Sequence, residues 1–191
     1  MNKLLYTLAI GLCGAVIVHI VTLLLTPHYA RDHIWNELES RNAAYQFHRI
    51  DAQNGMLAVP DSMLRSAVCR FSLGDGPVHI TAEGHLPFWS ISVFSRDGIN
   101  RYSLNDRTVA SQRLDLIIAD RIQMLELKQT PSQRVATAII SEQPIKDGFV
   151  ILRVLQTDES WQKIVDDFFT QAQCRSLYQT PDQSVEDTTT N

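Results

Sequence analysis

Residues 87–107 read PFWSISVFSRDGINRYSLNDR, and this stretch decides the fold class that the sequence predicts. Its first half alternates, with Trp89, Ile91 and Val93 on one side and Phe88, Ser90, Ser92 and Phe94 on the other. Asp97-Gly98 is a compact hairpin signal, so residues 100–104 are predicted to be the return strand. Alternation of this kind is typical of an antiparallel sheet with one face exposed to water.

Further short strands flank the hairpin on both sides. Residues 68–73 and 78–81 alternate around the turn signal Gly74-Asp75-Gly76-Pro77. With the hairpin they make four strands joined by tight turns, which predicts an antiparallel meander rather than βαβ units. Later strands are expected at 114–118, 134–140 and 149–155, and short helices at 62–68, with Asp61 as N-cap, and at 121–128, with Asp120 as N-cap.

The C-terminal half ends in the most regular helical pattern of the chain. Asp158 is the expected N-cap, and the apolar positions recur at helical spacing: Trp161, Ile164, Val165, Phe168, Phe169 and Ala172. This stripe is expected to pack on the protein's own sheet, although it has the pattern of a partner-docking face as well. The predicted class is therefore α+β and β-rich: a sandwich-like antiparallel domain with a C-terminal amphipathic helix packed on it.

The N-terminus carries a different pattern. Leu4–Leu25 is an uncharged run that spans about 33 Å as a helix, enough to cross a bilayer. It exceeds the apolar region of a cleaved signal peptide, so we interpret it as an uncleaved signal anchor. A turn at Thr26-Pro27 follows. The predicted division is a transmembrane anchor at 1–26, a juxtamembrane helix at 27–46, a β-rich domain at 47–175 and a disordered acidic tail at 176–191.

Charge and cysteine usage indicate the cellular compartment of residues 27–191. The net charge of −4 excludes a basic nucleic-acid binder. The positive residues flanking the apolar run are nearly balanced, but a short N-terminal tail usually stays in the cytoplasm, which puts residues 27–191 in the periplasm of a bacterial inner membrane. Cys69 and Cys174, 105 residues apart, form either a disulfide, as an oxidising compartment allows, or two separate buried thiols.

No specific catalytic motif is present, and the sequence predicts no cofactor. Two histidine pairs, His79 with His85 and His28 with His33, lack a third ligand at suitable spacing, so no metal site is expected.

The candidate site is the hairpin itself. Asp106 is the candidate acid or base, Arg107 an anion clamp, Asn105 a ligand contact, and Trp89 or Tyr102 a stacking wall. The competing interpretation is structural, because Asn and Asp are good turn formers and an Asp-Arg pair commonly ties a loop to a sheet.

Three stretches carry a resemblance to a family: Val68-Cys69-Arg70-Phe71, the strand at 87–94, and Tyr102-Ser103-Leu104-Asn105-Asp106-Arg107. With the N-terminal anchor, residues 1–175 resemble the bacterial domain of unknown function 1254 family. The resemblance implies a β-rich domain and an envelope location, but it supplies no catalytic residues. In longer relatives the domain of unknown function 1214 follows, which implies here that a separate chain supplies it.

Two principal functions follow as hypotheses. The first is an interaction module that pairs with a companion envelope protein. The second is a periplasmic hydrolase or small-ligand-binding domain that uses the 87–107 hairpin. A third, lipid or cell-wall contact by the juxtamembrane helix, rests on Tyr29 and Trp35 near the bilayer surface.

Overall fold

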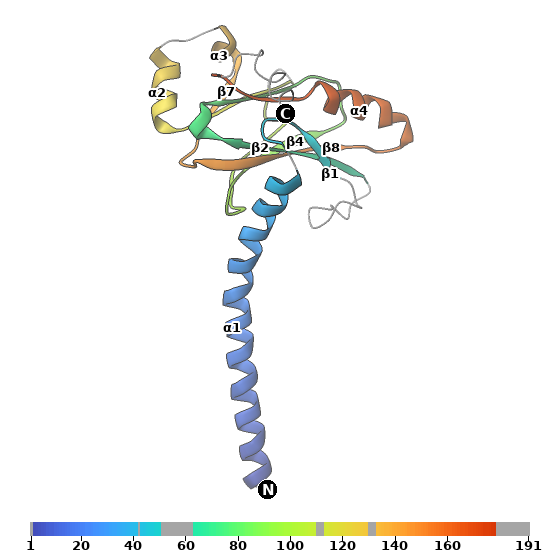
Figure 1. Cartoon of the computed structure of the whole chain (residues 1–191). Coiled ribbons are helices and arrows are strands. Elements are labelled where there is room, and N and C mark those ends of the chain that lie inside the picture. The colour runs from blue at the N-terminus through green and yellow to red at the C-terminus, as the bar shows by residue number, and fades with distance from the viewer. Residues whose placement is uncertain (1, 42, 51–62, 110–112, 130–132, 179–191) are drawn as a thin grey trace, which may run out of the picture.

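The structure is a computed structural model of the 191-residue chain. It describes residues 2–41, 43–50, 63–109, 113–129 and 133–178. These residues form a long N-terminal helix that carries a two-sheet domain at its C-terminal end (Figure 1).

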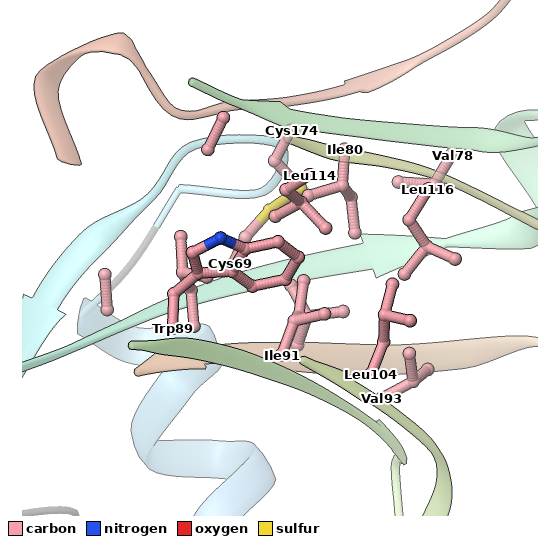
Figure 2. Close-up of a cluster of buried hydrophobic side chains, with 14 of the residues drawn as sticks. Cys69, Val78, Ile80, Trp89, Ile91, Val93, Leu104, Leu114, Leu116 and Cys174 are labelled. Atoms are coloured by element: carbon pink, nitrogen blue, oxygen red, sulfur yellow. A yellow bond between two sulfur atoms is a disulfide. The ribbon is translucent and has the colours of Figure 1, made fainter. Parts of the chain in front are cut away.

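The two sheets face each other and enclose the main core. The five-stranded sheet has the order β1-β2-β8-β4-β5, with bounds His48–Ile50, Leu64–Ser72, Asp147–Leu155, Trp89–Ser95 and Asn100–Asn105. The four-stranded sheet has the order β7-β6-β3-β9, with bounds Ile139–Glu142, Leu114–Ala119, Val78–Ala82 and Gln173–Ser176. All pairs are antiparallel except β6 with β7. Figure 2 shows side chains of β4, such as Trp89, Ile91 and Val93, meeting Ile80 of β3 and Leu114 and Leu116 of β6.

The predicted fold class is confirmed: the domain is α+β, β-rich and sandwich-like. The C-terminal helix α4 (Gln162–Gln171) buries Val165, Phe168 and Phe169 in the main core. It follows a 3-10 turn at Glu159–Trp161, where the Asp158 carboxylate accepts from the Ser160 backbone N–H, as an N-cap does. Helix α2 (Arg121–Gln129) has the expected cap, because Asp120 Oδ1 accepts from Gln123 N.

The predicted meander is wrong. Strands β2 and β3 belong to different sheets, and β8 lies between β2 and β4; only β4 and β5 pair as the hairpin foreseen. Alternation shows which face of a strand is buried but not which strand lies beside it. Gly148 assists the unforeseen pairing, since a Cβ there would lie 2.5 Å from the Phe94 carbonyl oxygen.

Two local predictions are also wrong. Residues 64–68, predicted within a helix, are the first half of β2, whose two faces are both buried, so its alternation is masked. Ala67 and Cys69 point into the main core, and Val68 packs against the end of the N-terminal helix. Residues 134–140 are not one strand: helix α3 (Gln133–Thr137) precedes β7. The predicted N-cap Asp61 lies outside the described residues.

Helix α1 (Asn2–Arg41) is continuous, so the turn predicted at Thr26-Pro27 is wrong. Proline has a helical φ and removes one N–H, which a long helix tolerates. The helix predicted for residues 27–46 ends at Arg41, as the last part of α1. Within α1, Lys3–Thr26 is long and apolar enough to cross a membrane. At the other end of the chain, Ser176 still belongs to β9, and residues 179–191 of the predicted tail lie outside the described part.

The C-terminal end of α1 packs on the outer face of the five-stranded sheet. Trp35 and Leu38 are buried against Val68 and Phe149. The guanidinium groups of Arg70 and Arg96 lie 5.6 and 5.2 Å from the centre of the Trp35 ring, so two cations contact the indole. Helix α1 is thus packed onto the domain rather than loosely tethered to it.

Candidate functional site

The structure separates the residues that the sequence grouped in the hairpin. The Trp89 side chain is 1 % exposed and lies in the main core, so it forms no stacking wall for a ligand. Tyr102, on the neighbouring strand, is half-buried and packs against the same core. A ligand site on the hairpin would need Trp89, Asp106 and Arg107 to line one open pocket. The burial of Trp89 in the core does not allow this arrangement.

Asn105 has the geometry of a turn former. Its side-chain oxygen accepts from the backbone N–H groups of Arg107 and Thr108, both at 3.1 Å. The Asp106 backbone N–H donates to the Trp89 carbonyl, and the Arg107 side chain is exposed. Asp106 Oδ1 is buried and, within the described residues, has no hydrogen-bond partner. The Asn105 turn, the Asp106 backbone bond and the exposure of Arg107 favour the structural interpretation of this segment, whereas the unpaired Asp106 oxygen does not contribute to it.

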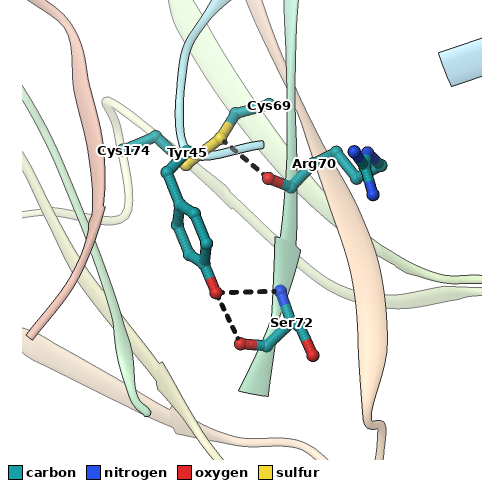
Figure 3. Close-up of a disulfide and its surroundings, with 5 residues drawn as sticks. All are labelled: Tyr45, Cys69, Arg70, Ser72 and Cys174. Carbon is teal, nitrogen blue, oxygen red and sulfur yellow. Dashed lines mark hydrogen bonds between the residues drawn. A yellow bond between two sulfur atoms is a disulfide. The ribbon is translucent and has the colours of Figure 1, made fainter. Parts of the chain in front are cut away.

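The disulfide between Cys69 and Cys174 is present, with a Cα–Cα distance of 6.6 Å. Cys174 lies on β9, which follows α4, so the bond joins the two sheets across the core. Beside it, Tyr45 adopts a positive φ of 62°, and its hydroxyl donates to Ser72 O at 2.8 Å (Figure 3). The same hydroxyl lies 2.7 Å from Asp75 Oδ2. Burial, and next the hydrogen bond to Asp75, raise the pKa of Tyr45.

A pocket of about 380 Å³ opens beside α2. It lies between α2 and the two segments that precede β3 and β8, and it is lined by Leu73, Gly74, Asp120, Arg121, Ile122, Pro144, Ile145 and Lys146. Its walls are held by short contacts. Gln123 Nε2 donates to Leu73 O at 2.6 Å, and Leu73 N donates to Lys146 O at 2.7 Å.

One face of α2 beside this pocket is apolar and exposed. Ile122 is 69 % exposed and Leu125 is 55 % exposed, while Met124 and Leu127 on the opposite face are buried. Ile122 and Leu125 are three residues apart, so they form one surface. Tyr178 extends this region, since its hydroxyl donates to Glu126 Oε2 at 2.7 Å, which raises the pKa of Tyr178. We call Ile122, Leu125 and the pocket the α2 surface.

Sequence reasoning did not single out the α2 surface. The signal was nonetheless there, because the helix carries two apolar pairs at i, i+3 spacing, Ile122 with Leu125 and Met124 with Leu127. One short helix packed on a sheet can bury one such face and leaves the other to solvent. The pocket had no sequence signal, since its walls come from segments far apart in the chain.

No group of three or more His, Cys, Asp or Glu side chains that could hold a metal ion exists in the part of the chain that the structure describes.

Comparisons with known proteins show a similarity of fold only. No family model matches the chain, and no curated protein matches it. Among solved structures, the chain is similar to the VPA0106 protein from Vibrio parahaemolyticus, with a TM-score of 0.57 and 10 % identity over 78 % of this chain and 35 % of that one. An uncharacterized protein from Burkholderia cenocepacia gives a TM-score of 0.43 and 10 % identity, over 68 % of this chain and 34 % of that one. The chain thus spans about a third of the length of these structures.

Proposed function

We propose that this protein is a membrane-anchored interaction module of the bacterial envelope, which docks a companion protein through the α2 surface. In this proposal Lys3–Thr26 is the anchor in the inner membrane, and the two-sheet domain lies in the periplasm. The Cys69–Cys174 disulfide supports that placement, because such bonds persist in oxidising compartments.

The observation that carries the proposal is the exposure of Ile122 and Leu125 next to the pocket. Two large aliphatic side chains on one helical face, beside an apolar depression lined by Leu73, Pro144 and Ile145, have the composition of an interface core. Asp120, Arg121 and Lys146 also line the pocket, so charged side chains of both signs border its apolar part. In Figure 1, α2 lies on the far side of the domain from the membrane-crossing part of α1, where a partner has free access.

The length comparison supports a companion of a particular kind. The chain covers 35 % of the Vibrio protein to which it is similar in fold, so in that protein this fold is combined with more chain. The resemblance to the domain of unknown function 1254 family points in the same direction. We propose that the companion carries the domain of unknown function 1214 and contacts the α2 surface.

Site-specific photo-crosslinking in intact cells tests this proposal. The full chain carries a photo-reactive phenylalanine at Leu125 or, as a matched exposed apolar control, at Ile99, which is 42 % exposed. We expect one discrete adduct from position 125, none from position 99, and loss of the adduct when Ile122→Asp is added. Equal adducts at both positions, or none at 125, would overturn the proposal.

A further inference from the structure

A polar cluster around Arg153 lies on the outer face of the five-stranded sheet, apart from the α2 surface. Residues opposite each other in antiparallel strands share a face, and Arg153 of β8 lies opposite Ser66 of β2 on one side and Ser90 of β4 on the other. Ser92 is two residues along β4 and shares this face. Its hydroxyl oxygen accepts from Arg153 Nη1 at 3.2 Å. One arginine and three serines therefore share this part of the sheet face, with a direct contact between Arg153 and Ser92.

The charge of Arg153 is not balanced by its described neighbours. The arginine ion pairs among the described residues join Arg49 to Asp166, Arg70 to Glu39 and Arg113 to Glu83, and none includes Arg153. Burial lowers the pKa of Arg153, which reflects the cost of holding its charge away from water. A partly buried cation without a carboxylate is well placed to bind an anion from solution.

Ser66 is the second, independent sign of a ligand. Its side chain is 2 % exposed, yet its Oγ has no hydrogen-bond partner among the described residues. A buried hydroxyl without a partner is costly in a finished structure. Ser66 is directly opposite Arg153 in the β2–β8 pair, so its side chain lies on the same sheet face as the guanidinium.

We propose that Arg153, Ser66, Ser90 and Ser92 form a binding site for the phosphate group of a soluble ligand. A guanidinium offers two parallel N–H donors, and three hydroxyls add up to three more. A carboxylate has only two oxygens to accept them, whereas a phosphate has three or four.

The geometry favours a soluble ligand over a lipid headgroup. Leu38 of α1 packs on this same sheet face, thirteen residues beyond Leu25, a helical rise of about 20 Å. The headgroup layer extends only about 5–8 Å beyond the hydrocarbon. With Lys3–Thr26 in the bilayer, as proposed above, the sheet face that Leu38 contacts lies beyond the headgroup layer, and the Arg153 cluster belongs to that face.

Calorimetric titration of the detergent-solubilised full chain with inorganic phosphate, and separately with acetate, tests the site. We expect phosphate to bind, acetate to bind at least about tenfold more weakly, and Arg153→Gln to weaken phosphate binding about tenfold or more. Ser90→Ala, which leaves the charge intact, should weaken it severalfold. Arg175→Gln, an equal charge change on the outer face of the other sheet, should have no effect.

Thermal melting establishes that each variant is folded before titration. If Arg153→Gln fails to fold, Arg153→Lys replaces it; the lysine keeps the charge but loses the paired donors, so phosphate should still bind more weakly. Equal phosphate binding by wild type, Arg153→Gln and Arg175→Gln would overturn the site. Binding to nanodiscs rich in phosphatidylglycerol, lost in Arg153→Gln, together with no binding of inorganic phosphate, would overturn the soluble ligand in favour of a lipid.

Discussion

Cys69 and Cys174 are bonded across the core, so that β2 of one sheet is covalently joined to β9 of the other. Both side chains are buried among the apolar residues that the sheets enclose. The bond ties the last strand of the domain to a strand near its beginning, and it closes a loop that contains most of the fold.

Removing this bond should destabilise the domain substantially. For a loop of 105 residues, the chain-entropy model gives about 4–5 kcal/mol. We expect the Cys69→Ala/Cys174→Ala double variant to lose stability of that order in urea denaturation. Cys13→Ser, which changes an exposed free cysteine, should match wild type. Equal denaturation midpoints for the double variant and wild type would show that the bond adds nothing to stability.

The two roles considered for the 87–107 hairpin predict different responses to truncation. Trp89 is in the core, so Trp89→Ala should cost about 3–5 kcal/mol of unfolding free energy. Arg107 is exposed, and Arg107→Ala should lie within about 0.5 kcal/mol of wild type. Chemical denaturation measures both values. A hydrolytic activity that Arg107→Ala abolishes without affecting stability would instead revive the catalytic interpretation.

Helix α2 should show a sharp contrast between neighbouring leucines. Leu127 is buried beside Ile117 and Val135, so Leu127→Ala should cost about 2 kcal/mol or more. Leu125→Ala, at an exposed position, should change stability by less than about 0.5 kcal/mol. Thermal melting of the two variants tests the assignment of the two faces, and similar losses in both would contradict it.

The packing of α1 on the sheet should depend on Trp35. Trp35→Ala removes a buried ring that packs with Val68 and Phe149 and contacts Arg70 and Arg96, so hydrogen exchange at residues 34–41 should become faster. Exchange in β8, which lies in the middle of the sheet, should change little. Trp35→Phe, which keeps an aromatic ring, should show an intermediate rate; unchanged exchange in Trp35→Ala would contradict the packing described.

Tyr45 should make the domain sensitive to alkali. Its folded-state pKa is raised above the ordinary value of 10.0, so its neutral form is the one that the fold stabilises. That contribution is complete below about pH 10 and decreases as the pH rises above 10. Tyr45→Phe loses the hydrogen bonds to Ser72 and Asp75 and should cost about 1 kcal/mol at pH 8.

The pH profile separates this effect from general alkaline unfolding. Between pH 9 and 11.5, the stability difference between wild type and Tyr45→Phe should shrink, because only wild type loses the contribution of the neutral hydroxyl. A constant difference over that range would exclude the hydroxyl as its source.

Local sequence determined much of this protein. Several features depend only on periodicity, turn chemistry and composition within a few residues. They are the uncharged run at Leu4–Leu25, the β4–β5 hairpin, the caps at Asp120 and Asp158, and the apolar stripe of α4. Each was predicted with the correct type, although Ile164 of the predicted stripe is 42 % exposed. The cysteine pair was also identified, since an even number in the larger part of the chain suggested a bond.

Only the tertiary structure decided which strands pair and where polar groups meet. Strand β8 lies between β2 and β4, although it begins about fifty residues after β4 ends. No local sequence pattern specifies that strand order. Because β8 lies there, Arg153 is between Ser66 and Ser90. Trp89, which the sequence suggested as part of a ligand site, is buried in the main core. Strand pairing depends on how much apolar surface the whole sheet buries, which is a property of the complete fold. Turns and helix caps depend only on the residues that form them.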